Sequence, residues 1–154
     1  MPLTLTSRAF QQGGTIPKRY TCDGDNVSPP FACSGVPEGT QSFLLVCDDP
    51  SAPSGTFHHW AAYDIPARWR GLAEGHGPES LADGFKQAIN DLQKPGYTGP
   101  CPPPGDKPHH YHFCLSALSE PSLPVAPSAA FEEVILVARP YVLERVELIG
   151  LYGR

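Results

Sequence analysis

The sequence is poor in charged residues, and its basic residues do not cluster. Only 18% of its 154 residues are Asp, Glu, Lys or Arg, and the formal net charge is −5. The densest basic stretch, residues 68–70, holds two arginines. Proteins that bind nucleic acid need clustered Lys and Arg to neutralise phosphates. We therefore expect no nucleic-acid partner.

Long apolar runs are also missing. The two longest, Phe43–Cys47 and Val134–Ala138, have five residues each, whereas a membrane-spanning helix needs about 20. The N-terminal residues, MPLTLTSRAFQQGG, lack the basic start and apolar stretch of a secretory signal. We expect no transmembrane segment and a cytoplasmic location.

Cysteine does not occur in a pattern typical of cross-links. The five cysteines are an odd number at irregular spacing, and no CxxC occurs. They are Cys22, Cys33, Cys47, Cys101 and Cys114. We expect buried or partly buried free thiols, which agrees with a cytoplasmic location.

The common catalytic motifs are absent. The sequence contains no GxSxG, HExxH, P-loop or dinucleotide fingerprint. Ser51 or Ser54 near His59 and Asp49 has the composition of a hydrolytic triad, although short loops often hold such trios by chance. We keep a small hydrolase as a minor alternative and expect no enzyme and no cofactor.

Histidine clustering raises a zinc alternative. Five of the six histidines fall in two groups, but adjacent residues on a strand point to opposite faces. His110 and His112 could share a face, yet no third ligand is evident. We expect no metal.

Proline is the abundant residue. There are 19 prolines in 154 residues, more than twice the usual share of about 5%. Because proline interrupts helices and sheet ladders, the connections should be long, stiff and irregular. An apolar share of 40% still provides a core, and the length fits one domain over residues 1–154.

Strand patterns dominate the rest of the chain. Short apolar or alternating runs predict strands at Leu3–Thr6, Phe31–Cys33, Ser42–Cys47, Trp60–Ile65, Tyr111–Leu118 and Val146–Tyr152. One C-terminal helix is expected, capped by Ser128 and ended by Pro140, and a weaker helix over Leu81–Asn90. Phe131, Val134, Ile135 and Ala138 would form the apolar face of the C-terminal helix. The fold class is mainly β, an antiparallel sandwich or barrel.

Two segments combine a stiff loop with titratable side chains. Residues 48–55, DDPSAPSG, lead into Phe57–Trp60, and residues 96–105, GYTGPCPPPG, lead into His109–His112. If the two strands share a sheet, their histidines can meet at one end of it. Imidazole, tyrosine hydroxyl and free backbone N–H groups are donors that suit an oxyanion, and Asp49 could accept from one imidazole. The first loop alone could equally be an ordinary turn.

These segments resemble the phosphatidylethanolamine-binding protein family, also called Raf kinase inhibitor-like proteins, in its short bacterial and archaeal branch. The resemblance includes RYTCDGDNVSPPF, GVPEGTQSFLLVCDDP and the final ELIGLYGR, so it runs nearly end to end. It implies a β-sandwich of two antiparallel sheets with a C-terminal helix and an anion pocket at one end.

The resemblance also implies the pocket residues. They are Asp49, Ala52, Pro53, His59, Gly99, Pro100, Pro102, Pro103, His109 and Tyr111. It further implies a cis bond at Ala52–Pro53. Two motifs depart from the family: its DPDAP has Ser51 in place of the second aspartate, and its HRY has His110 in place of arginine.

The expected function is a binding module for a small anionic or phosphorylated ligand. Affinity should rise as histidine protonates, roughly from pH 7 to 6. The alternative is an inhibitor of a kinase or serine protease that acts through residues 100–108. The resemblance implies a homodimer.

Overall fold

The computed structural model describes residues 2–53, 55–75 and 85–154. Along the chain the elements are β1 (Thr4–Thr6), the 3-10 helix η1 (Lys18–Tyr20), β2 (Phe31–Ser34), β3 (Ser42–Asp49), β4 (Phe57–Pro66), β5 (Gly71–Leu72), β6 (Lys86–Gln87), β7 (His109–Leu118), α1 (Phe131–Ala138), the 3-10 helix η2 (Arg139–Tyr141) and β8 (Val142–Tyr152).

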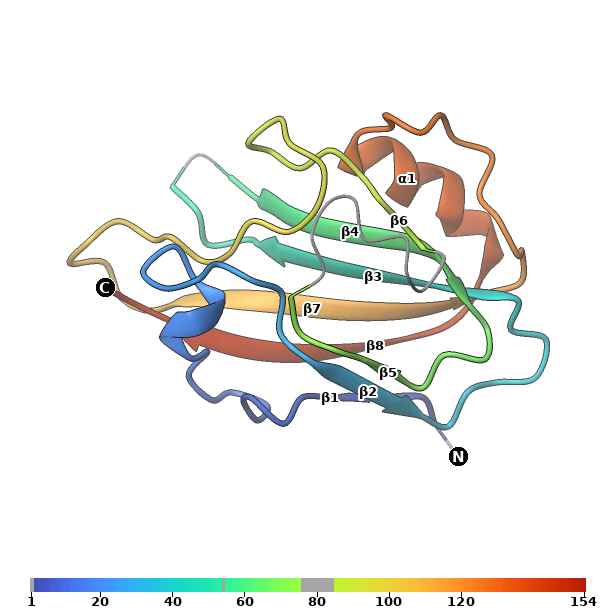
Figure 1. The fold of residues 1–154 in the computed structure, drawn as a ribbon, viewed down its shortest axis with the longest axis horizontal. Coiled ribbons are helices and arrows are strands. Elements are labelled where there is room, and N and C mark those ends of the chain that lie inside the picture. The colour runs from blue at the N-terminus through green and yellow to red at the C-terminus, as the bar shows by residue number, and fades with distance from the viewer. Residues whose placement is uncertain (1, 54, 76–84) are drawn as a thin grey trace.

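Two antiparallel sheets make up the architecture. The larger sheet has the order β6-β4-β3-β7-β8 and the smaller has the order β1-β2-β5. All pairings between these strands are antiparallel. Figure 1 shows the long strands β3, β4, β7 and β8 side by side, with α1 next to β4 and β6. The predicted β-sandwich with one C-terminal helix is confirmed.

The inner face of the larger sheet holds the main core. Phe31 of the small sheet contacts Trp60 of β4 and Phe113 of β7, with ring centroids 6.4 and 5.2 Å apart. Buried aromatic rings at these separations contribute packing beyond the area they remove from water. This core fixes which face of β3, β4 and β7 points inward, and therefore which polar side chains at the strand ends do so too.

The helix covers part of the outer face. Phe131 and Val134 of α1 pack with Leu44 and Tyr63 in a second apolar cluster. The helix begins at Phe131, and its N-cap is Ala130, which makes no side-chain cap hydrogen bond. The predicted cap at Ser128 is therefore wrong. The first helical residue is Phe131, which is itself buried, so the helix begins three residues after Ser128.

The second predicted helix, Leu81–Asn90, is wrong where the structure describes it. Residues 81–84 lie outside the described part, and Lys86–Gln87 form β6, an edge strand paired with Ala62 and Tyr63. Helical spacing over so short a stretch does not outweigh the hydrogen bonds offered by the open edge of β4.

The predicted absence of a disulfide is also wrong. Cys22 and Cys101 are bonded across 79 residues of sequence, while Cys33, Cys47 and Cys114 are free and buried. The odd number of cysteines arises because one disulfide occurs together with three free cysteines in the core. This bond removes the support that cysteine usage gave to a cytoplasmic location. Among the helices of the described residues, none combines the length and apolar character needed to cross a membrane.

Candidate anion-binding site

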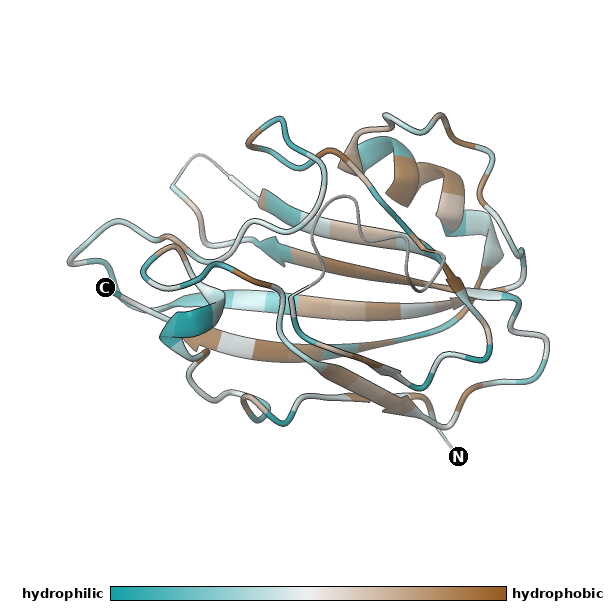
Figure 2. Ribbon diagram, in the orientation of Figure 1, coloured by the Kyte–Doolittle hydropathy of each residue, from teal (hydrophilic) through white to brown (hydrophobic). Residues whose placement is uncertain are grey.

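The polar ends of three adjacent strands meet at one end of the larger sheet. Figure 2 shows hydrophilic residues at the ends of β3, β4 and β7 that lie on the left, while their middles are more apolar. Residues 50–53 and 96–108 reach the same end, as do residues 20–26 and the C-terminus (Figure 1). Two segments that are distant in sequence are thus brought together, as the sequence predicts.

His59 points inward because of an irregularity in β4. The β3–β4 register shifts between Cys47 and Asp48, which pair with Trp60 and His58, so His59 is the extra residue. A bulge of this kind re-aims a side chain locally. His59 Nδ1 lies 2.7 Å from the carbonyl oxygen of Thr98, and because a carbonyl only accepts, Nδ1 carries the proton. In neutral His59, Nε2 is therefore an acceptor.

His109 lies between two carboxylates. Its Nδ1 is 2.7 Å from Oδ2 of Asp49, and its Nε2 is 3.1 Å from Oδ2 of Asp106. Burial lowers the pKa of His109, but the hydrogen bonds to Asp49 and Asp106 outweigh it, so the pKa is raised overall. Both ring nitrogens face carboxyl oxygens, which favours the doubly protonated imidazolium.

Tyr111 lies in contact with both histidines. Its ring centroid is 5.4 Å from that of His59 and 6.3 Å from that of His109. Burial is the main cause that raises the pKa of Tyr111 well above the ordinary value. The hydroxyl therefore stays protonated and can donate at neutral pH.

Asp49 also organises the first loop. Its Oδ1 accepts from the backbone N–H and the hydroxyl of Ser51, at 2.9 and 2.7 Å. Ala52 is half-buried and Pro53 is exposed, so neither is drawn into the histidine cluster. The predicted cis bond at Ala52–Pro53 is wrong, since no cis peptide bond occurs among the described residues. Here the Asp49–Ser51 hydrogen bonds and one from Gly55 N–H to the Ala52 carbonyl shape the turn.

The predicted proline wall divides into an inner and an outer part. Gly99, Pro100 and Pro102 are buried, whereas Pro103 is exposed. Gly99 packs closely: a Cβ there would lie 2.3 Å from the carbonyl oxygen of Tyr20. The inner residues thus fix the loop to the segment before β2, and Pro103 belongs to the part of the loop that reaches solvent.

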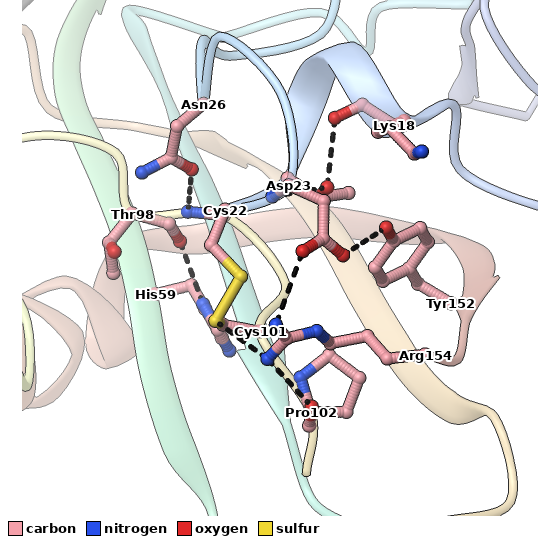
Figure 3. Close-up of a disulfide and its surroundings, with 12 residues drawn as sticks. Lys18, Cys22, Asp23, Asn26, His59, Thr98, Cys101, Pro102, Tyr152 and Arg154 are labelled. Atoms are coloured by element: carbon pink, nitrogen blue, oxygen red, sulfur yellow. Dashed lines mark hydrogen bonds and ion pairs between the residues drawn. A yellow bond between two sulfur atoms is a disulfide. The ribbon is translucent and has the colours of Figure 1, made fainter. Parts of the chain in front are cut away.

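A disulfide to Cys22 and contacts with the C-terminal residues hold this loop in place. The Cys22–Cys101 bond lies next to an ion pair between Asp23 and Arg154, 3.3 Å apart, and Tyr152 donates to the same aspartate (Figure 3). Figure 3 also shows His59 and its hydrogen bond to Thr98 near the disulfide. The wall of the site is therefore attached to distant parts of the chain.

The cluster is closed. The four central residues are almost inaccessible: Asp49 is 3% exposed, His59 5%, His109 5% and Tyr111 1%. A cavity of about 850 Å³ lies instead on the outer face of the sheet, between α1 and β8. The expected open hollow between the histidines is thus filled by side chains in this structure, with Asp106 on its outer side.

The minor alternatives find little support in the geometry. The Ser51 hydroxyl bonds to Asp49, and Ser54 lies outside the described residues. His112 pairs with Glu147 at 2.6 Å, and His110 is exposed. Within the part of the chain that the structure describes, no group of three or more His, Cys, Asp or Glu is placed to hold a metal ion.

Two partners in the cluster were missed by sequence reasoning. Thr98 contributes its carbonyl, which every residue type carries, so no side-chain signal marks it. Asp106 lies within GDKPHH, three residues before His109, and this short spacing could have suggested the contact.

The fold and the cluster define a small β-sandwich protein with buried, carboxylate-oriented histidines at one end of its larger sheet. The sequence model of the family "Phosphatidylethanolamine-binding protein" matches residues 6–153. The chain belongs to this family.

Relatives are similar along nearly the whole chain. A protein of Aquifex aeolicus called UPF0098 protein is 48% identical over 152 residues, covering 99% of this chain and 89% of the relative. The crystal structure of Escherichia coli YbcL, described as a new member of the mammalian family, has a TM-score of 0.93 at 32% identity and covers 100% and 99% of the two chains. A homologue from Chlamydia trachomatis has a TM-score of 0.89 at 32% identity, covering 99% and 98%.

Proposed function

We propose that this protein is a binding module for a small anion, such as a phosphoryl or carboxylate group, at the cluster of Asp49, His59, His109 and Tyr111. The observation that carries the proposal is the placement of Tyr111, whose buried ring contacts two imidazoles that are each held in a fixed orientation. A protonated imidazole and a tyrosine hydroxyl in one buried cluster are donors that suit an oxyanion.

Each of the three groups, His59, His109 and Tyr111, has a distinct role. Protonated His109 supplies a positive charge and is held by Asp49. Tyr111 supplies a neutral donor. His59, fixed by Thr98, presents Nε2 as an acceptor, and this nitrogen suits the P–OH group of a singly protonated phosphate.

Removal of the Tyr111 hydroxyl tests the site. Tyr111→Phe should weaken binding of inorganic phosphate about tenfold, because a hydrogen bond to a charged group is lost without changing the packing. Titration followed by NMR chemical shifts or calorimetry measures the effect. Tyr63→Phe is the matched control, since Tyr63 is equally buried and lies on the outer face, and its hydroxyl has no partner within the described residues. Equal affinity in both variants would refute the site.

Anion affinity should depend on pH through His109 and His59, whose pKa values are shifted in opposite directions. The pKa of His109 is raised, so affinity should persist at neutral pH and fall as the pH rises through that value, above about 6.5. Burial, the largest cause, lowers the pKa of His59, so a second gain should appear only in acid. Sulfate is the suitable probe because its charge is constant over this range. A flat binding profile would contradict this assignment.

A protein-inhibitor function is the second candidate. Residues 103–108 are exposed and rich in proline, and the loop before them is fixed by the disulfide and by Arg154. A stiff exposed loop loses little conformational entropy on binding a partner such as a kinase or protease. Inhibition assays with Pro103 and Pro104 replaced by glycine would test this function separately from phosphate binding.

A further inference from the structure

Asp106 covers the outward nitrogen of His109. Its Oδ2 lies 3.1 Å from His109 Nε2, and its side chain is 43% exposed, whereas that of His109 is 7% exposed. Asp106 belongs to a tight turn in which its backbone N–H donates to the Pro103 carbonyl and Gly105 adopts a φ of +89°. The carboxylate therefore lies at the boundary between the buried cluster and solvent.

The two carboxylates on His109 differ in their surroundings. Asp49 is 4% exposed at its side chain, lies in β3, and is held by Ser51 as well as by His109. Asp106 has His109 as its only side-chain partner among the described residues. Asp49 is thus built to orient the ring, while Asp106 can rotate into water without moving a buried atom.

We propose that Asp106 is an internal competitor for the anion site, and that its carboxylate occupies Nε2–H of His109 until an external anion displaces it. This inference rests on the proposed function, because it assumes that anions bind at this cluster. A carboxylate oxygen offers the imidazolium the same acceptor chemistry as a ligand oxygen. Since Asp106 is only three residues from His109, its effective concentration at the ring is at least in the millimolar range.

Competition makes a sharper prediction than charge repulsion. An internal competitor reduces the population of the open site, and this reduces the affinity of every ligand by the same factor. Simple repulsion by the Asp106 charge would instead act more strongly on a doubly charged ligand than on a singly charged one. A neutral amide at position 106 can still accept from Nε2–H, although more weakly than a carboxylate.

The experiment measures binding of inorganic phosphate, doubly charged sulfate and singly charged acetate to the full chain and to three variants. Asp106→Ala removes the competitor, Asp106→Asn weakens it, and Glu38→Gln removes a negative charge from the loop before β3, at the opposite end of the sheet. Titrations are run at a pH, set for each variant from ring 15N shifts, at which His109 carries both protons.

Asp106→Ala should bind all three anions about tenfold more tightly, which corresponds to one charge-assisted hydrogen bond. Asp106→Asn should show an intermediate gain, and Glu38→Gln should match the unmodified protein. Unchanged or weaker binding by Asp106→Ala, while the unmodified protein binds phosphate, would overturn the competitor and leave the anion site standing. A gain confined to sulfate and phosphate, equal in both Asp106 variants, would also overturn it. No binding by any form would refute the proposed function itself.

Discussion

Replacing both Cys22 and Cys101 with serine should lower the free energy of unfolding by about 4.5 kcal/mol. The bond closes a loop across 79 residues, and the chain-entropy account gives roughly that value for a loop of this length. Both residues are exposed, so the serine hydroxyls remain hydrated and add no burial cost. Urea unfolding followed by circular dichroism measures the difference between the variant and the oxidised protein.

Reduction provides the matched control. A thiol reductant should lower the stability of the unmodified protein to nearly that of the double variant, and it should leave the double variant unchanged. The three remaining cysteines are buried and free, so they offer the reductant no further bond. A double variant as stable as the oxidised protein would mean that Asp23, Tyr152 and Arg154 hold the loop without the disulfide.

The disulfide and the two shortest strands were not predicted from the sequence. Local patterns located six of the eight strands in the described part of the chain, because strands such as β3, β4 and β7 carry apolar residues that match one face of a sheet. They missed β5 and β6, which are two residues long and form through pairing with β2 and β4. The pairing of Cys22 with Cys101 depends on tertiary proximity, and spacing along the chain cannot reveal that.

The sequence predicted the central residues of the candidate site, but it did not predict most of the contacts that these residues make. The resemblance and the loop-to-strand patterns indicated Asp49, His59, His109 and Tyr111, which the structure brings together. The contact of each histidine depends on a particular backbone geometry, such as the register shift opposite His59. The placement of Pro53 and Pro103 at the surface likewise follows from the loop path, which composition does not determine.

Asp49→Ala should destabilise the protein by about 3–5 kcal/mol, because it leaves the buried His109 without its oriented partner. Loss of the Asp49 carboxylate also leaves the backbone N–H and the hydroxyl of Ser51 without their acceptor. Asp48→Ala is the matched control, one residue away on the opposite face of β3. Burial, the largest cause, raises the pKa of Asp48, so its ionised form is disfavoured by folding. The control should be neutral or more stable than the unmodified protein.

The pH dependence separates a lost ion pair from general damage at position 49. The raised pKa of His109 means that its contribution to stability is fully present below its unfolded value of about 6.5. That contribution is lost as the pH rises through the folded value. The stability gap between Asp49→Ala and the unmodified protein should therefore narrow as the pH rises above about 6.5. The lowered pKa of His59 acts in the opposite direction, since its contribution is lost in acid, and burial, the largest cause of that shift, is common to both proteins. A gap that stays constant with pH would show that Asp49 stabilises the loop through Ser51 and not the charge on His109.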